Sequence, residues 1–261
     1  MKIGMIGCGN MGGALLNAAI AAGYRDAVCV SDPYAGRAES YGVAASDNVQ
    51  IARECTFLFL GVKPQMLDGV LNEIQPILAA RTDRFVLVSM AAGVSMAHIR
   101  AIVEAPLIRI MPNTPVSVGE GMIVYDSVGV TDAEIAEFRA ILAKAGRLDP
   151  LPERLIDAAG AISGCGPAFA FLFAEALADG GVECGLPRDK AALYAAQMLL
   201  GSAKLLLNGG HPGVLKDAVC SPGGTTIAGV HALESGAFRA NVMNAVTAAY
   251  EKTLALASLR G

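Results

Sequence analysis

Tryptophan is absent from this chain of 261 residues, and charged residues make up only 17% of it. The formal net charge is −4, and lysines and arginines form no cluster. Because a nucleic-acid interface needs a basic patch, we expect no nucleic-acid partner. The histidines, His98, His211 and His231, have neither metal-ligand spacing nor a triad partner, so we also expect no metal site.

Cysteine is scarce and scattered. The six cysteines form no C-x-x-C pair and no secretory framework, so we interpret them as reduced core thiols of a cytoplasmic protein. The glycines of residues 7–13 interrupt the apolar N-terminal run, which argues against an export signal. The cysteines are Cys8, Cys29, Cys55, Cys165, Cys184 and Cys220.

One long stretch, residues 158–174, has no charge at all. The sequence Gly164-Cys-Gly-Pro167 interrupts it, and Glu175 and Asp179 follow. This pattern favours a helix that is buried or lies at a subunit interface, and we expect no membrane contact.

A glycine-rich turn opens the chain. Residues 3–6 are apolar and predict a buried strand, Gly7-x-Gly9-x-x-Gly12 predicts a turn, and residues 14–22 predict a helix. In this order Gly7 permits the turn, Gly9 lets the backbone approach a pyrophosphate, and Gly12 lets helix and strand pack closely. The sequence therefore predicts a dinucleotide site at its N-terminus.

Strands alternate with helices over the first 150 residues, which predicts a Rossmann-like, doubly wound α/β sheet. Residues 149–152, Asp-Pro-Leu-Pro, predict a stiff linker, so the predicted domains are 1–150 and 151–261. The expected strands after the first are 27–31, 43–45, 56–62, 85–89, 107–111, 122–125 and 147–149.

Two further strand ends predict cofactor contacts. Asp32 stands about twenty residues beyond the glycine loop, where an acidic residue binds the adenosine ribose and favours NAD, whereas Arg37 suits a 2′-phosphate. A ligand-free Asp-Pro turn is the alternative. Val62 and Lys63 follow another strand, although Lys63 is equally explained as a surface lysine. The small residues 91–93 leave room for a flat ring.

The remainder of the chain predicts an all-helical domain. Gly185, Gly209-Gly210 and Gly236 separate its helices. So little surface charge on helices predicts burial against another subunit. The expected helices are 153–161, 167–184, 188–207, 212–219, 225–234 and 237–259.

A second glycine turn, Ser221-Pro-Gly-Gly-Thr-Thr226, leads into one of these helices. The free N–H groups of a helix start favour an anion, and a small carboxylate fits. The alternative is a capping turn with Thr225 as the N-cap. His211 is better explained as a helix cap than as a catalytic group, and Lys216 and Asp217 either pair with each other or shape the pocket.

The chain resembles the pyrroline-5-carboxylate reductase family nearly from end to end. Most specific is His211-Pro-Gly-x-Leu-Lys-Asp217 followed by Ser221-Pro-Gly-Gly-Thr-Thr226. The resemblance also rests on Ile6-Gly-Cys-Gly-Asn-Met-Gly12, Val62-Lys-Pro64, Ala91-Ala-Gly93, Met111-Pro-Asn-Thr-Pro115, Ser163-Gly-Cys-Gly-Pro167 and Ala178-Asp-Gly-Gly181.

The resemblance implies hydride transfer from NADPH, and also from NADH, to 1-pyrroline-5-carboxylate, giving L-proline. It implies a Rossmann-like domain and an intertwined helical dimerisation domain, with larger assemblies built from dimers. It assigns Gly224, Thr225 and Thr226 to the substrate carboxylate, Thr226 to the ring nitrogen as the catalytic residue, and Glu153 to a place near the ring. Asn48 is placed near the adenosine. The full expected cofactor set is Gly7, Cys8, Gly9, Asn10, Met11, Gly12, Ser31, Asp32, Asn48, Val62, Lys63 and Ala92.

Two features depart from this family. Some relatives have an acidic residue where Gly209-Gly210 stands here, and Asp32 disfavours the 2′-phosphate of NADPH. One rival is a two-domain hydroxyacid-type reductase with a catalytic lysine, but Lys190, Lys204 and Lys216 lie in no matching motif. The other rival is a nucleotide sensor without catalysis, against which the intact second glycine turn argues. The sequence leaves open which cofactor is preferred and which assembly forms beyond a dimer. It also leaves open whether other cyclic imines are reduced and whether proline inhibits the reaction.

Overall fold

The computed structural model describes residues 1–258 and divides into two compact units. The sheet unit comprises Met1–Cys165 and the chain from Ala249 on, and the helical unit is Gly166–Ala248. The helix Glu153–Ser163 (α7) thus belongs to the sheet unit. The predicted domains, 1–150 and 151–261, stay a prediction from the linker.

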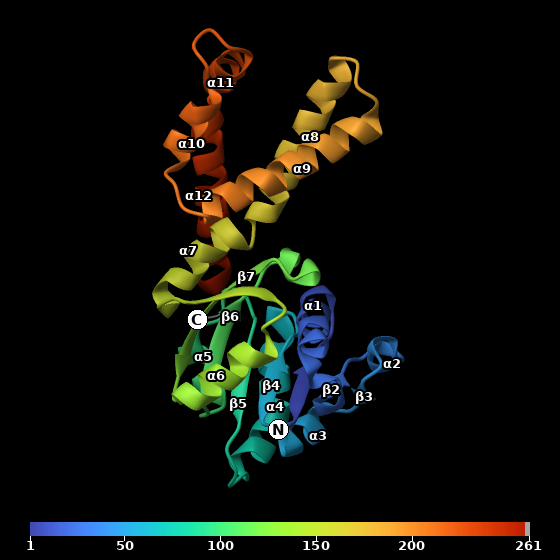
Figure 1. Ribbon diagram of the computed structural model, residues 1–261. Helices are drawn as coiled ribbons and strands as arrows, with labels where there is room; N and C mark the ends of the chain where they lie inside the picture. The colour runs from blue at the N-terminus through green and yellow to red at the C-terminus, as the bar shows by residue number, and fades with distance from the viewer. Residues whose placement is uncertain (259–261) are drawn as a thin grey trace. The chain divides into compact units, whose positions relative to one another are not determined.

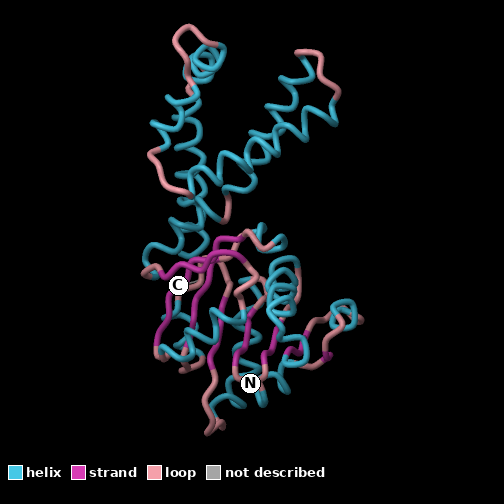
Figure 2. The backbone as a smooth tube through the Cα atoms, in the orientation of Figure 1, coloured by secondary structure: helices cyan, strands magenta, loops and turns pink. Residues whose placement is uncertain are grey.

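Eight strands form one sheet in the order β3-β2-β1-β4-β5-β6-β7-β8, drawn in Figure 1 and as magenta segments in Figure 2. Neighbouring strands are parallel except for β6 and β7, so the predicted Rossmann-like sheet is confirmed. The strands are β1 (Ile3–Ile6), β2 (Val28–Ser31), β3 (Ala44–Ala45), β4 (Phe57–Leu60), β5 (Val86–Ser89), β6 (Leu107–Met111), β7 (Gly121–Val128) and β8 (Gly146–Pro150).

The antiparallel pair was not expected from the sequence. β7 is longer than the predicted strand 122–125 and runs antiparallel to β6. Between them lies only a short loop with the 3-10 turn Thr114–Val118. A parallel crossover needs a dozen or more residues, so this connection returns the chain in the opposite direction.

Both faces of the central strands are buried, which explains why their sequences are continuously apolar. In β4, Phe57 and Phe59 join one hydrophobic cluster, whereas Leu58 and Leu60 join the cluster on the opposite face. All four residues are at most 1% exposed.

Side-chain caps start several helices of the sheet unit. Asp47 and Ser95 accept hydrogen bonds from the third residue after them, and Thr131 with Glu134 forms a capping box. The helices are α1 (Asn10–Ala19), α2 (Arg37–Tyr41), α3 (Asn48–Glu54), α4 (Pro64–Ala79), α5 (Met96–Ile102), α6 (Asp132–Ile141) and α7.

The helical unit contains the helices predicted from residue 167 on; two have the predicted bounds, and the others differ by one residue at their described ends. They are α8 (Gly166–Glu183), α9 (Arg188–Leu207), α10 (Pro212–Val219), α11 (Thr225–Ser235) and α12 (Phe238–Ser258), which continues into the sheet unit. The predicted end of the last helix, Leu259, lies outside the described residues. α8 and α9 pack together, with Gly181 against Ala191.

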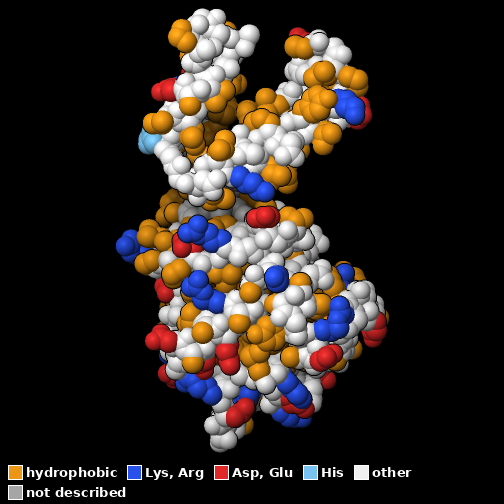
Figure 3. All heavy atoms as spheres, in the orientation of Figure 1, with side chains coloured by type: hydrophobic (Ala, Val, Ile, Leu, Met, Phe, Trp, Pro, Cys, Tyr) orange, Lys and Arg blue, Asp and Glu red, His pale blue; other side chains and the backbone are white. Residues whose placement is uncertain are grey.

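Large apolar side chains of the helical unit are exposed, among them Phe171 at 69% and Leu207 at 76%. Figure 3 shows such side chains along its helices. By length and composition alone, the stretch Glu153–Glu183 would suffice to span a membrane. A helix that packs against another subunit can have the same length and apolar composition.

Candidate active site

The glycine loop follows β1, where β1 lies between β2 and β4 and the strand order changes direction. Gly7 has φ +84°, and a Cβ there would lie 2.9 Å from the backbone of Gly61 and Val62. A Cβ at Gly12 would lie 2.5 Å from the Gly7 carbonyl oxygen. Gly9, the N-cap of α1, faces open space. The loop therefore offers a helix N-terminus that a phosphate can approach.

The loop after β4 lies against this first loop. A Cβ at Gly61, which follows β4, would lie 2.3 Å from the Gly7 oxygen. On the other side, Gly7 donates its N–H to the carbonyl of Ser31, the last residue of β2. Val62 is half-buried, and the exposed Lys63 begins α4 as its N-cap. The structure thus brings Gly7, Val62 and Lys63 to the same edge of the sheet.

Asp32 has a structural role that the sequence analysis missed. One carboxylate oxygen accepts the Cys8 N–H at 2.7 Å, and the other accepts the Tyr34 N–H at 3.0 Å. The side chain is only 5% exposed, and Arg37 Nε lies 3.9 Å from it. The carboxylate therefore holds the glycine loop. Arg37 lies over the Tyr34 ring, 5.5 Å from its centroid.

The thiol of Cys8 is buried inside the same loop. Burial, with a further contribution from the Asp32 charge, raises the pKa of Cys8 to about 11. Cys8 is therefore a neutral thiol at neutral pH, not a thiolate. Its polar contact in the loop is the backbone N–H that it donates to Asp32.

Two hydrogen bonds between side chains link β2 to α3 and α4. Ser31 Oγ donates to Asn48 Oδ1 at 2.7 Å, and Asn48 Nδ2 donates to Glu73 Oε2 at 2.7 Å. The resemblance placed Asn48 near the adenosine and Ser31 in the expected cofactor set, and the structure brings these two residues together.

The loop after β5 carries the third group of expected residues. Ala91 is buried, Ala92 is exposed, and Gly93 makes the turn with φ +68°. Ser89 Oγ accepts the Ala91 N–H at 3.4 Å. Small side chains thus border the carboxyl end of β5.

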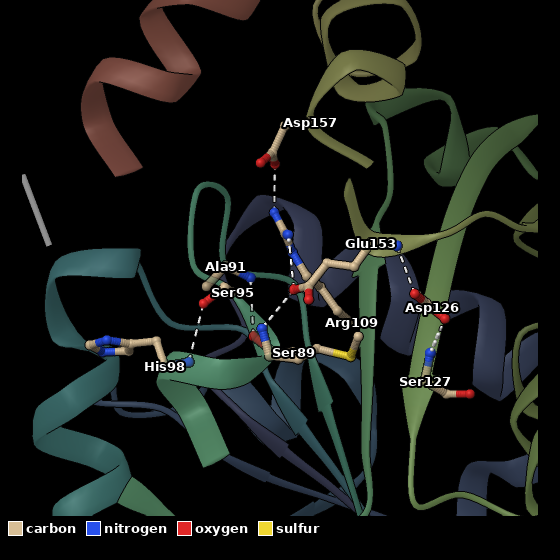
Figure 4. Close-up of polar contacts among 10 residues, drawn as sticks. Ser89, Ala91, Ser95, His98, Arg109, Asp126, Ser127, Glu153 and Asp157 are labelled. Atoms are coloured by element: carbon tan, nitrogen blue, oxygen red, sulfur yellow. Dashed lines mark hydrogen bonds and ion pairs between the residues drawn. The ribbon is translucent and has the colours of Figure 1, made fainter. Parts of the chain in front are cut away.

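Glu153 belongs to an ion-pair network around Arg109, shown in Figure 4. Its Oε1 atom accepts the Met96 N–H at 2.6 Å and lies 3.2 Å from Arg109 Nη1. Arg109 Nη2 pairs with Asp157 Oδ1 at 2.5 Å, and Arg109 is 3% exposed. Asp126 Oδ2 accepts the Glu153 N–H at 2.6 Å. The network fixes the starts of α5 and α7 on the sheet.

The sequence analysis did not single out Arg109. Its signal was a charged residue inside the apolar strand Leu-Ile-Arg-Ile-Met of β6. Because a buried guanidinium needs carboxylate partners, this position could have been interpreted as one member of a buried ion pair. Contact of Glu153 with a substrate ring stays a prediction.

The second glycine turn lies in the helical unit. The Gly224 N–H donates to the Ser221 carbonyl at 3.0 Å, and Gly223 has φ +68°. A Cβ at Gly224 would lie 2.2 Å from Ser221 Oγ, so the Ser221 side chain would have to rotate to admit one, whereas the positive φ of Gly223 favours glycine at that position. Gly224 is the N-cap of α11, so the alternative with Thr225 as the cap is wrong.

Thr225 and Thr226 are exposed in the first turn of α11. The first N–H groups of a helix have no carbonyl within the helix to bind. Beside the turn, Gly223, Gly224, Ile227 and His231 line a surface hollow. The turn therefore has the geometry of a small-anion site. It lies in a different compact unit from the cofactor loop.

The remaining candidates have structural partners. His211 Nδ1 accepts the Gly213 N–H at 3.1 Å, which confirms His211 as the cap of α10. Lys216 Nζ pairs with Asp217 Oδ1 at 2.5 Å. Within residues 1–258, no group of three or more His, Cys, Asp or Glu side chains is placed to hold a metal ion.

Comparison with known proteins agrees with this geometry. A family profile described as "Pyrroline-5-carboxylate reductase dimerisation" matches residues 153–256. The pyrroline-5-carboxylate reductase of Arabidopsis thaliana is 40% identical over 266 residues, covering 97% of this chain and 94% of the relative. That of Escherichia coli is 40% identical and covers 97% of each chain. The chain belongs to the pyrroline-5-carboxylate reductase family.

The family's solved structures share the fold. The Plasmodium falciparum pyrroline carboxylate reductase, determined with NADP bound, is 34% identical with a TM-score of 0.88 and covers 98% of both chains. A second profile, "NADP oxidoreductase coenzyme F420-dependent", matches residues 2–93, which contain the glycine loop. This part of the sheet unit is thus similar to NADP oxidoreductases.

Proposed function

We propose that the protein is an NADPH-dependent reductase that converts 1-pyrroline-5-carboxylate into L-proline, the last step of proline biosynthesis. The observation that carries the proposal is the pair of glycine turns. One leaves Gly9 open at the start of α1 for a pyrophosphate, and the other leaves the start of α11 open for a carboxylate. When bound, the reduced cofactor supplies a hydride from its nicotinamide C4 to the C5 carbon of the cyclic imine.

The cofactor site is proposed at the carboxyl ends of the central strands. The N–H groups at the start of α1 bind the diphosphate, and the loop after β5 borders the nicotinamide. Ser31, Asn48 and the backbone around Asp32 border the adenosine. The proposed set is Gly7, Cys8, Gly9, Asn10, Met11, Gly12, Ser31, Asp32, Asn48, Val62, Lys63 and Ala92.

NADPH is the proposed preferred cofactor, with NADH also accepted. The Asp32 carboxylate is used by the Cys8 and Tyr34 amides and is only 5% exposed, which weakens its repulsion of a 2′-phosphate. The neighbouring Arg37 guanidinium supplies positive charge on the same side. NADH lacks the 2′-phosphate and therefore gains nothing from Arg37.

The substrate carboxylate is proposed to bind at the start of α11. The Gly224 N–H is engaged by Ser221, so the N–H groups of Thr225 and Thr226 are the donors, and Gly224 contributes the turn. The Thr226 hydroxyl orients the ring nitrogen and relays a proton to it, which makes the imine a better hydride acceptor. Glu153, which holds the start of α5 in the sheet unit, is also proposed as a substrate-binding residue.

A homodimer is the proposed assembly, with larger assemblies built from dimers. The exposed apolar side chains of the helical unit and the dimerisation profile over 153–256 support it. The proposed division into a cofactor domain (1–150) and a dimerisation and substrate domain (151–261) follows the linker. We place the protein in the cytoplasm, without a membrane or nucleic-acid partner.

Oxidation of NADPH and of NADH, followed by absorbance with freshly prepared pyrroline-5-carboxylate, tests the proposal. We expect oxidation that depends on the imine and yields L-proline in equal amount, faster with NADPH. Cofactor binding without turnover of any imine acid would instead support a sensor. Turnover of a hydroxyacid or ketoacid alone would support the hydroxyacid-type reductase.

A further inference from the structure

Two cysteine thiols meet on one face of the sheet unit. Cys29 lies on β2, and Cys55 directly follows α3. Their sulfur atoms are 3.6 Å apart. Gly4 on β1 pairs in register with Cys29, and a Cβ at Gly4 would lie 3.0 Å from the Cys55 sulfur. The missing side chain of Gly4 therefore leaves room for the contact.

A surface hollow of about 330 Å³ reaches this pair. Cys29 is half-buried and Cys55 is buried. Both line the hollow together with Lys2, Ser46, Gln50 and Glu54. A small polar molecule can therefore approach Cys29 from solvent, with the Cys55 sulfur 3.6 Å away.

The environment gives the two thiols different reactivities. The hydrogen bond between the two thiols lowers the pKa of Cys29, burial opposes this shift, and Ser46 and Lys2 lower the pKa further. The same hydrogen bond, together with burial, raises the pKa of Cys55. Cys29 is thus the better nucleophile, and Cys55 remains a thiol beside it.

We propose that Cys29 and Cys55 form a dithiol site that a small peroxide oxidises to an intrachain disulfide. The Cys29 thiolate attacks one peroxide oxygen, the O–O bond breaks, and the leaving hydroxide takes up a proton to become water. The Cys55 thiol then attacks the resulting sulfenic sulfur and displaces a second water. The two sulfurs lose two electrons, and the peroxide gains them.

The other four cysteines lack such an arrangement. Cys8 is buried, and its pKa is raised to about 11. Within residues 1–258, no other two cysteine sulfurs are within hydrogen-bond contact of each other. A disulfide bond is about 2.05 Å long, so the side chains of Cys29 and Cys55 must turn toward each other to form it. Disulfide formation is therefore expected at this pair alone.

Peptide mapping of the full-length protein treated with dilute hydrogen peroxide tests the proposal. Trypsin releases Cys29 in peptide 26–37 and Cys55 in peptide 54–81, because Pro64 protects the bond after Lys63. We expect the intact mass to fall by two hydrogens and these two peptides to appear linked. A dithiol reductant should separate them again.

Cys184→Ser is the matched control, because Cys184 is exposed in the helical unit. This variant should keep the linked peptides, whereas Cys29→Ser and Cys55→Ser should each lose them. Oxidation of Cys184 in the unmodified protein while Cys29 and Cys55 stay free would overturn the proposal. A sulfinic acid on Cys29 without a link would overturn it too. The readout is a mass, so it does not depend on the proposed enzymatic activity.

Discussion

The sheet unit and the helical unit bury their apolar side chains to very different degrees. The large, fully buried side chains, such as Phe57, Phe59 and Phe138, all lie in the sheet unit. In the helical unit, the buried hydrophobic residues are only alanines: Ala178, Ala191 and Ala195. Its large side chains are exposed, including Phe171 and Leu207.

The difference shows that apolar content alone does not make a core. In the sheet unit, apolar strands are covered on both faces by helices of the same chain. α8 has apolar residues on all sides and needs more neighbours than its own chain supplies. A second subunit provides such neighbours. The cofactor loop thus lies on a completed core, and the second glycine turn lies on helices that we propose a dimer completes.

The largest expected effect concerns the internal network of the sheet unit. Arg109→Met leaves Glu153 and Asp157 without their cation, and breaking a buried ion pair costs about 3–5 kcal/mol. Urea unfolding of the variant should show this loss. Arg84→Met is the matched control, because Arg84 pairs with Glu134 at the surface. We expect a much smaller loss of unfolding free energy in Arg84→Met. Equal losses in both variants would contradict the stabilising role of the buried Arg109 network.

The next effect concerns the surface of the helical unit. Phe171→Asp places a charge on α8, where we propose that the partner subunit packs, and should weaken dimerisation by at least about 2 kcal/mol. Sedimentation at several concentrations would measure the shift toward monomer. Met66→Asp, on an exposed part of α4 in the sheet unit, should leave the assembly unchanged. An unchanged assembly in both variants would contradict the proposed interface.

Cofactor preference gives a smaller effect within the sheet unit. Arg37→Gln removes the positive charge beside Asp32 and should raise the KM for NADPH about tenfold, since a charge-assisted hydrogen bond contributes about 1.5–3 kcal/mol. The KM for NADH should hardly change. Steady-state kinetics with both cofactors would measure the split, and an equal rise in the two KM values would exclude a 2′-phosphate role for Arg37.

The smallest effect is a dependence of stability on pH. The hydrogen bond from Arg84, with those from Thr131, lowers the pKa of Glu134 to about 2. A lowered pKa stabilises the folded state above the ordinary carboxyl pKa, and this stabilisation is lost as pH falls from about 5 toward 2. Glu134→Gln should therefore flatten that part of the stability curve. An unchanged curve would show that the Arg84 pair contributes nothing.

Much of the fold could be predicted because it depends on local signals. The glycine loop, the apolar strands and the helices of the helical unit follow from turn residues and periodicity. The direction of β7 could not be predicted from its own residues, because it depends on the short connection after Met111. The N-cap of α11 could not be predicted for a similar reason: Gly224 takes that place in a turn closed by its N–H bond to the Ser221 carbonyl, a contact visible only in three dimensions.

The candidate site was predictable where glycine or motif residues carry it, and less so where charges pair across the chain. Asp32 occupies its expected position, but its bond to the Cys8 N–H depends on how two loops meet. Arg109 stands alone in an apolar strand, and its partners Glu153 and Asp157 follow more than forty residues later. Such long-range partners have no signature in a single sequence.

Thr226→Val tests the central claim most directly, because it removes the proposed catalytic hydroxyl in the helical unit and leaves the cofactor loop untouched. We expect kcat for pyrroline-5-carboxylate to fall about a hundredfold, the usual contribution of a positioned proton donor, with the Kd for NADPH unchanged. Single-turnover kinetics and cofactor titration of the same preparation would measure both. Unchanged kcat in Thr226→Val would contradict the assignment of the second glycine turn as the substrate site.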